Sequence, residues 1–191
     1  SYLLSGELAT KLTGRYVEFE LFPLSFDEYL DMKSFLGKEV NANLLIELNN
    51  YLQEGGFPKA MQYDDFADKR TYVRSVIDEI FEKDIKRRIK VRNVETFNNV
   101  RNFIINNFGA TVSIKSLQEA LSKNGMEVKR ATLSRYIGAL LQSKILYQCD
   151  RFDMKSKRAL SGEKKYYLAD ISFYFATNTD NRINYGPALE N

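Results

Sequence analysis

Between positions 93 and 168 the apolar residues change from helical to alternating spacing. Of all features of the sequence, this change restricts the possible folds most. Three stretches repeat apolar residues every three or four positions, which is typical of helices that bury one face. The first ends at Gly109, the second runs from Ser113 to a turn at Gly125, and the third covers about residues 130–143. Their inward-facing residues are Val94, Phe97, Ile104, Ile105, Phe108, Leu117, Ala120, Leu121, Leu133, Ile137, Leu140 and Leu141. This spacing predicts three amphipathic helices around one core.

Two segments with strand-like alternation follow the third helix. They cover residues 145–152 and 164–168, and the loop between them is basic. Three helices followed by a two-stranded basic hairpin is the element order of a winged helix. We therefore predict a winged-helix domain over residues 93–170, within a chain that is mainly α with a short β hairpin.

Basic side chains gather where a winged helix would face a nucleic acid, on the third helix and in the wing. Cations there favour contacts with phosphates. The nucleic-acid candidates are Lys129, Arg130, Arg135, Lys155, Lys157 and Arg158, with Thr132 and Tyr136 expected beside them on the exposed face of the third helix. The same surface is open to a second use, as a lid or protein-docking surface.

A helical connector is predicted before the winged helix, over residues 23–92. Ser25 and Glu28 have the spacing of a capping box, so a helix is expected from there to about Phe35. A second helix over residues 41–53 is closed by a glycine pair that needs special backbone geometry.

The strongest helical periodicity lies between Lys69 and Arg88. Glu82 and Lys86, and likewise Asp84 and Arg88, are spaced as i,i+4 pairs outside the apolar stripe. The stripe consists of Val73, Val76, Ile77, Ile80, Phe81 and Ile85. We predict one long, well-packed helix here.

Residues 16–21 predict a strand with one face exposed to water, or a strand at a sheet edge. Val17, Phe19 and Leu21 alternate with glutamates, and Pro23 ends the pattern. At the other end of the chain, residues 173–175 can pack on the wing and residues 178–184 read as a polar loop.

The composition excludes several kinds of catalytic site. The chain has no histidine, so Ser-His-Asp, Cys-His and histidine-ligated zinc sites are excluded. Its single cysteine, Cys149, excludes an internal disulfide and is predicted to be a half-buried strand residue. Neither a G-x-x-x-x-G-K-[ST] nor a G-x-G-x-x-G motif occurs. No metal site is therefore expected.

Charge and hydropathy bear on the partners. Residues 1–70 contain 7 Lys and Arg against 12 Asp and Glu, whereas residues 71–191 contain 21 against 13. A basic half can face nucleic acid, an acidic partner or solvent. The chain has neither an apolar run of about 18 residues nor a basic leader, so we expect no membrane partner and a cytoplasmic location.

Several segments, in this order across nearly the whole chain, resemble a family of prokaryotic AAA-type ATP-binding proteins. Members of this family join a P-loop ATPase core to a winged helix and to a C-terminal domain related to restriction-endonuclease folds. The matching segments are Leu3-Leu4-Ser5-Gly6-Glu7, Leu12-Thr13-Gly14-Arg15, Phe22-Pro23-Leu24-Ser25-Phe26-Asp27-Glu28-Tyr29-Leu30, Gly55-Gly56-Phe57-Pro58, Lys83-Asp84-Ile85, Arg92-Asn93, Tyr147 to Lys155, Lys165-Tyr166-Tyr167-Leu168 with Asp170, and Leu189-Glu190-Asn191.

The resemblance implies an internal fragment of a longer protein. Residues 1–22 would be the remnant of the ATPase core with its last strand, and residues 171–191 the beginning of a truncated C-terminal domain. ATP and magnesium would bind the longer protein, whereas the fragment lacks the phosphate-binding loop and is expected to bind no cofactor and to be inactive. Arg15 is the candidate arginine for the γ-phosphate. Its alternatives are structural: a pairing with Glu18 or Glu20, or a position that covers a helix C-terminus.

Two functions remain open from the sequence. In the first, the winged helix is a lid, regulatory or coupling module of an ATP-binding protein, and its partners are the missing ATPase core and C-terminal domain. In the second, the chain is a winged-helix DNA-binding module with an N-terminal helical interaction region. The sequence leaves the oligomeric state open.

Overall fold

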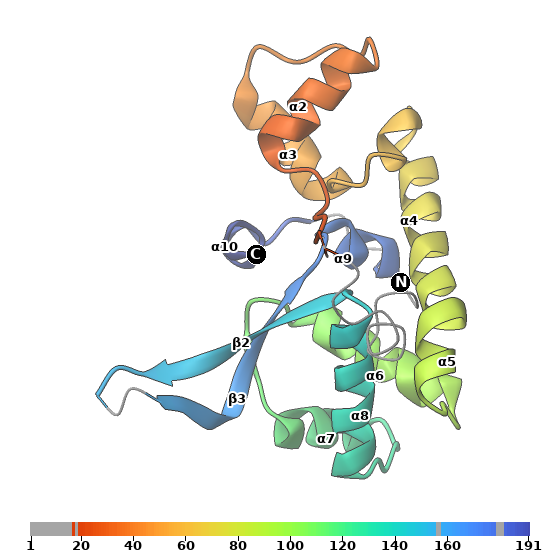
Figure 1. Ribbon diagram of the computed structural model, residues 1–191, viewed down its shortest axis with the longest axis vertical. Coiled ribbons are helices and arrows are strands. Elements are labelled where there is room, and N and C mark those ends of the chain that lie inside the picture. Colours follow the sequence, from red (N-terminus) through yellow and green to blue (C-terminus); the bar gives the residue numbers. More distant parts are fainter. Residues whose placement is uncertain (1–16, 18, 156–157, 179–181) are drawn as a thin grey trace.

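The computed structural model describes residues 17, 19–155, 158–178 and 182–191. The described chain is mainly helical and contains a small three-stranded antiparallel sheet (Figure 1). The predicted fold class, mainly α with a short β hairpin, is confirmed in these respects.

Two short helices form a hairpin at one end of the molecule (Figure 1). Helix α2 (Phe26–Phe35) begins at the predicted capping box, in which Ser25 and Glu28 each bond the other's backbone N–H. Helix α3 (Leu44–Glu54) is capped by Asn43, whose side chain accepts from the N–H of Leu45 at 3.1 Å. The helix ends at Gly55.

The predicted long helix is a rod of three consecutive helical pieces along one side of the molecule (Figure 1). They are α4 (Phe66–Ile80), the π-helical turn η3 (Phe81–Ile85) and α5 (Lys86–Arg88), preceded by the 3-10 turn η2 (Ala60–Gln62). Val73, Ile77, Phe81 and Ile85 are buried, so the apolar stripe continues through the π turn. The expected Glu82–Lys86 pair is present at 2.6 Å.

The remaining elements surround the main core. In chain order they are α6 (Val94–Asn106), β1 (Thr111–Val112), α7 (Ile114–Lys123), α8 (Arg130–Gln142), β2 (Leu146–Asp153) and β3 (Arg158–Leu168). The strands are arranged in the order β1-β3-β2, and both pairings are antiparallel. The two-residue strand β1 was not predicted. Beyond the helices, β2 and β3 extend outward as a hairpin (Figure 1).

The chain after β3 returns to the same core. Helix α9 (Ser172–Thr177) packs against α3 and α4, and its Phe173, Phe175 and Ala176 are buried. Helix α10 (Tyr185–Glu190) adds Ala188. One cluster of buried apolar residues therefore runs from the connector through the three-helix region to α10. The domain boundaries at residues 92 and 170 stay predictions.

The strand expected near the start is absent from the described residues. Residues 17 and 19–22 carry no strand assignment, and the side chains of Val17, Phe19 and Leu21 are 78%, 80% and 91% exposed. An alternating segment becomes a strand only when a neighbouring strand accepts its backbone hydrogen bonds, and β1, β2 and β3 pair only with one another. The prediction of a strand is wrong for these residues.

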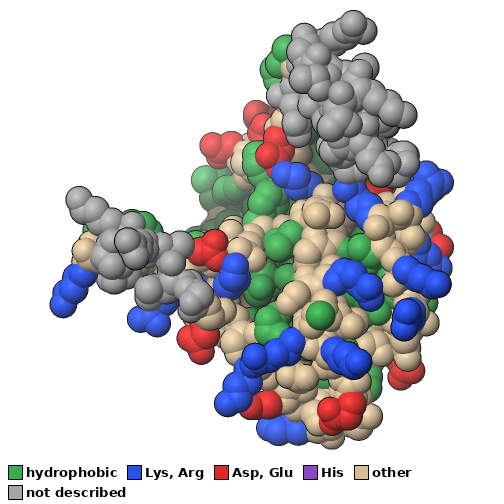
Figure 2. Space-filling model, turned by 60° about the horizontal axis from the view of Figure 1, so that its bottom comes forward, with side chains coloured by type: hydrophobic (Ala, Val, Ile, Leu, Met, Phe, Trp, Pro, Cys, Tyr) green, Lys and Arg blue, Asp and Glu red, His purple; other side chains and the backbone are tan. Residues whose placement is uncertain are grey.

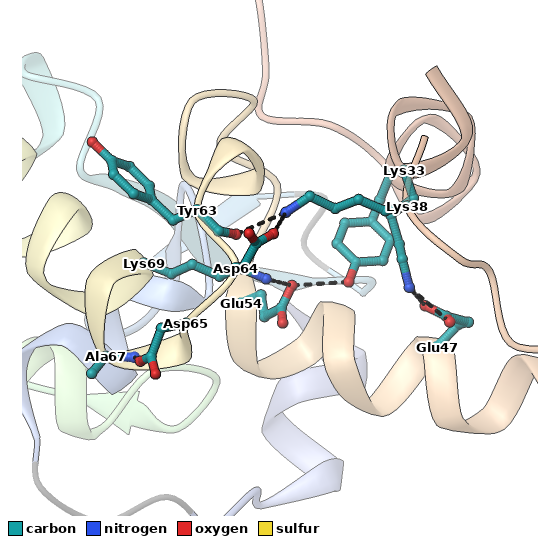
Figure 3. A network of polar contacts seen from close by, with 10 residues as sticks. Lys33, Lys38, Glu47, Glu54, Tyr63, Asp64, Asp65, Ala67 and Lys69 are labelled. Atoms are coloured by element: carbon teal, nitrogen blue, oxygen red, sulfur yellow. Dashed lines mark hydrogen bonds and ion pairs between the residues drawn. The ribbon is translucent and has the colours of Figure 1, made fainter. Parts of the chain in front are cut away.

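Polar side chains tie the helices of the connector together (Figure 3). Lys33 on α2 contacts Glu47 on α3 at 2.7 Å, and the Glu47 side chain is only 2% exposed. Glu54, at the end of α3, accepts from the hydroxyl of Tyr29 at 2.9 Å and from Lys69 on α4 at 2.7 Å. These contacts fix α2 and α4 relative to α3.

We expect Lys33→Ala to lower the free energy of unfolding by about 2 kcal/mol at pH 7, because it leaves a buried carboxylate without its cation. Burial opposes ionisation of Glu47, but hydrogen bonds from Lys33 and from the Asn41 N–H hold its pKa below the ordinary value of 4.5. A lowered pKa in the fold means that the stabilisation is present above pH 4.5 and is lost as the pH falls.

Urea denaturation at several pH values measures this effect. The loss caused by Lys33→Ala should shrink as the pH falls below about 4.5, because a protonated Glu47 no longer needs a cation. The exposed Lys59, whose ammonium donates to Gln62, provides the control, and Lys59→Ala should change stability by less than about 0.5 kcal/mol. A loss for Lys33→Ala that does not depend on pH would contradict this account.

Candidate functional site

Gly55 and Gly56 form a turn that no residue with a side chain can occupy without a clash. Gly55 has φ +76°, and a Cβ atom placed on it would lie 1.9 Å from Oδ1 of Asp170. A Cβ on Gly56 would lie 2.3 Å from the carbonyl oxygen of Leu24. The backbone at this turn, called the glycine turn below, is therefore in close contact with two distant segments.

Asp170 anchors the glycine turn from the end of β3. It is buried, and its carboxyl accepts hydrogen bonds from the N–H of Gly56 at 2.7 Å, from the N–H of Ser172 at 2.9 Å and from the Ser172 hydroxyl. No Lys or Arg of the described residues forms an ion pair with it. Burial raises the pKa of Asp170, and the three hydrogen bonds offset this only in part.

The segment before α2 lies on the other side of the glycine turn. The N–H of Leu24 donates to the carbonyl of Gly56 at 2.8 Å. The Tyr51 hydroxyl, on α3, donates to the carbonyl of Leu24 at 2.8 Å. Residues 24, 56 and 170 are thus joined by a continuous set of hydrogen bonds.

A half-open pocket of about 400 Å³, called the junction pocket below, lies beside these contacts. Its walls come from five parts of the chain: residues 22–25, the end of α3 with the glycine turn, Tyr147 on β2, residues 167–171, and the end of α10. Asn191 closes one wall, since its amide accepts from the N–H of Leu168 at 2.7 Å and donates to the Leu168 carbonyl at 3.1 Å. Glu190 beside it accepts from Tyr167 at 2.7 Å.

The lining of the junction pocket is aromatic, apolar and acidic. Its described lining residues include no Lys or Arg, and its carboxyls are those of Asp170 and Glu190. Nothing in this lining favours a phosphate, and the described residues contain no group of three potential ligands that could hold a metal ion. The arrangement is that of a joint at which five segments of the chain meet.

The structure places the predicted nucleic-acid candidates on α8 and the hairpin. Lys129, Arg130, Arg135 and Lys155 are exposed. Lys157 lies outside the described residues, and Arg158 is the first residue of β3. Arg130 and Arg135 lie on α8 and Lys129 is its N-cap residue. These three cations, called the α8 cations below, are not among the residues that line the junction pocket.

Three predictions about exposure are wrong. Val94, which was expected to face inward, is 42% exposed at the start of α6. Tyr136 is 2% exposed and packs edge-on against Phe97 with ring centroids 5.2 Å apart, because it lies on the same side of α8 as the core residues Leu133 and Leu140. Cys149 on β2 was expected to be half-buried and is exposed. The α8 cations therefore flank a narrower polar face than predicted.

Arg15, Lys83 and Asp84, which belong to segments that carry the family resemblance, do not line the junction pocket as far as the structure describes them. Arg15 lies outside the described residues. Lys83 forms an exposed pair with Glu79, and Asp84 is buried within the π-helical turn. The roles of Asp170 and Asn191 in the junction were missed, although both stand in segments that carried the family resemblance; the glycine pair was the only local signal of the junction.

No helix of the described chain is long and apolar enough to cross a membrane. The chain is 31% identical over its whole length to an uncharacterized protein of Methanocaldococcus jannaschii, covering 44% of that protein. It is also 31% identical over 99% of its length to an uncharacterized protein of Haemophilus influenzae, covering 46% of that protein. The chain thus spans about half the length of these curated relatives.

A family model described as "Domain of unknown function (DUF8612)" matches residues 45–182. The matched residues include the glycine turn, Asp170 and the whole of α4 to α9. The chain therefore belongs to the DUF8612 family.

Proposed function

We propose that this chain is a regulatory and coupling segment of a longer ATP-binding protein of the AAA type, and that residues 93–170 are a winged helix acting as its lid or coupling module. The observation that carries this proposal is the junction pocket, at which residues 22–25, the glycine turn, β3 and the end of α10 meet.

The order of elements supports the winged helix. Helix α6, strand β1, helices α7 and α8, and the β2–β3 hairpin follow one another as in that fold, including a short first strand on the outside of β3. Its core is formed by Phe97, Leu117 and Leu133, each fully buried.

The junction supports coupling for a mechanical reason. A movement of residues before α2 reaches Gly56 through the Leu24 hydrogen bond, and from there Asp170 and the end of β3. A movement of α10 reaches the same strand through Asn191 and Leu168. Bodies attached at either end of the described chain would therefore act on one joint, because packed elements move as units and not by continuous bending.

The ATP assignment rests on the resemblance and on chain length. The relatives are about twice as long as this chain, which leaves room for a nucleotide-binding core outside it. The exposed Val17, Phe19 and Leu21 form no strand within the described chain, but their alternation would suit pairing with a sheet of the longer protein.

ATP turnover and hydrogen exchange in the longer protein test the proposal. We expect the longer protein to bind and hydrolyse ATP, the 191-residue chain to do neither, and Arg15→Ala in the longer protein to lower turnover by about a thousandfold. The Gly56 N–H, which is hydrogen-bonded to the buried Asp170, is the reporter of coupling, and its exchange rate should change when ATP is added.

Each outcome bears on a separate part of the proposal. A longer protein that binds no ATP contradicts the ATP assignment. Binding of ATP with no change at the Gly56 amide, while amides of the nucleotide core do respond, contradicts coupling through the junction. Unchanged turnover in Arg15→Ala contradicts the role of that arginine alone.

A further inference from the structure

The charges of the described chain are separated along the molecule. Residues 23–70, from α2 to the start of α4, contain 5 Lys and Arg against 9 Asp and Glu, whereas the described residues 113–155 and 158–165 contain 11 against 5. Figure 2 shows Lys and Arg side chains spread over the face that α7 and α8 contribute and along the hairpin. Such a face attracts a polyanion.

Within this basic region, α8 presents cations that the fold does not use. Lys129, Arg130 and Arg135 are exposed, and none of them forms an ion pair with any described residue. The guanidinium of Arg135 lies 5.7 Å from the ring centroid of Tyr136, a distance at which the aromatic ring attracts a cation. Glu119 and Glu127 line the same surface hollow as Arg130, but neither forms an ion pair with it. Glu119 lies 3.7 Å from Lys115, and Glu127 accepts from the Ser122 hydroxyl.

The exposed side of α8 between these cations carries only small side chains. Ala131 and Ser134 are exposed, and Gly138 follows on the same side of the helix. Glycine is a poor helix former, and a Cβ on Gly138 would meet nothing within 4 Å, so the packing of the fold does not require glycine there. A helix surface without bulk lets a partner approach its backbone closely. Residues 129–138 on this side are called the α8 face below.

The β2–β3 hairpin adds a second set of cations. Arg151 and Lys155 are exposed on it, and Figure 1 shows that the hairpin extends away from α8. A helix whose exposed side carries small side chains flanked by cations, with a basic hairpin following it, matches a groove bounded by two phosphate backbones.

We propose that the α8 face binds duplex DNA, with the first two turns of α8 toward the major groove and the hairpin along the phosphate backbone. This inference goes beyond the coupling function and does not depend on ATP binding by the longer protein. Most of the affinity comes from phosphate contacts, so it falls steeply with salt.

Fluorescence anisotropy with a labelled 20-base-pair duplex tests the proposal on the whole 191-residue chain. We expect a Kd of about 1–10 μM at 50 mM salt and a linear fall of log K with log salt. Arg130→Gln combined with Arg135→Gln should weaken binding about tenfold and make the salt slope shallower by about 1.8, the value for two lost phosphate contacts.

The matched control is Lys59→Gln combined with Lys90→Gln. Both lysines are exposed, both lie outside the α8 face, and the pair lowers the net charge by the same amount. It should change affinity less than twofold. A third variant, Gly138→Leu, keeps every cation and adds bulk to the α8 face; it should weaken binding at least tenfold while the melting temperature stays the same or rises.

Three results would overturn the proposal. The first is no binding at 50 mM salt by a folded protein. The second is equal loss in the two double variants, because the overall charge and not the α8 face would then be responsible. The third is that the chain binds single-stranded RNA of the same length, or a second copy of itself, more tightly than duplex DNA. If Arg130→Gln combined with Arg135→Gln abolishes that tighter binding as well as the binding to DNA, the α8 face belongs to the tighter partner.

Discussion

Gly55→Ala is expected to lower the free energy of unfolding by about 4 kcal/mol, enough to unfold much of a marginally stable domain. The new Cβ would lie 1.9 Å from Oδ1 of Asp170 and 2.7 Å from the Cβ of Ser172, both of which are buried. Neither neighbour is the free end of a flexible side chain, so the clash can be relieved only by breaking the hydrogen bonds of Asp170. Urea denaturation followed by circular dichroism measures the loss.

Gly125→Ala is the matched control for the backbone conformation. Gly125 has φ +75°, nearly the φ of Gly55, and a Cβ there would meet nothing within 4 Å. It should therefore show only the cost of a left-handed conformation, about 1 kcal/mol. Equal losses at the two glycines would mean that the contact with Asp170 contributes nothing beyond backbone strain. Gly56→Ala, with its Cβ 2.3 Å from the Leu24 carbonyl, should resemble Gly55→Ala.

Elements fixed by local chemistry could be predicted from the sequence. The capping box at Ser25 and the cap at Ser113 are completed within three residues, and both helices begin where these residues predict. The cap at Asn43 was not predicted, and α3 begins at Leu44 instead of residue 41. The apolar stripe of the long helix depends only on helical spacing, and Val73, Ile77, Phe81 and Ile85 are buried as expected. The π turn at Phe81–Ile85 leaves no trace in that spacing.

Predictions failed where a distant partner decides the outcome. Residues 16–21 alternate as a strand does, but pairing depends on a neighbour that the described chain does not supply. Tyr136 carries a hydroxyl and follows Arg135, and both features favour an exposed position. Its ring nevertheless packs edge-on against Phe97 in the core. The two residues of β1 are too few for any periodicity and become a strand only against Lys164 and Lys165.

The junction shows the same limit. The glycine pair signals a special turn, but it does not signal which residue contacts it. Gly56 and Asp170 are 114 positions apart, and no local pattern connects them. The pairing follows from packing α9 against α3 and α4, which brings the end of β3 beside the end of α3. Only the three-dimensional fold therefore identifies Asp170 as the anchor of the turn.

Asp170→Ala is expected to lower the free energy of unfolding by about 3 kcal/mol. The substitution leaves three buried donors without an acceptor: the N–H groups of Gly56 and Ser172 and the hydroxyl of Ser172. Asp170→Asn keeps the shape and one acceptor oxygen, and should cost about half as much. The same denaturation measurement compares both variants, and a loss below about 1 kcal/mol for Asp170→Ala would mean that water reaches these donors.

The dependence on pH distinguishes the charge of Asp170 from its hydrogen bonds. Burial raises the pKa of this carboxyl above its ordinary value of 3.8, so the folded chain binds a proton more tightly than the unfolded chain. The stability that Asp170 contributes is then full below pH 3.8 and declines as the pH rises through the folded pKa, by at most about 1.4 kcal/mol per pH unit. The amide of the Asp170→Asn variant does not titrate, so the advantage of the natural residue over this variant should shrink from pH 3.5 to pH 7. An advantage that grows over this range would mean that the three hydrogen bonds outweigh burial and hold Asp170 as a carboxylate. The junction would then be more stable at neutral pH than in acid.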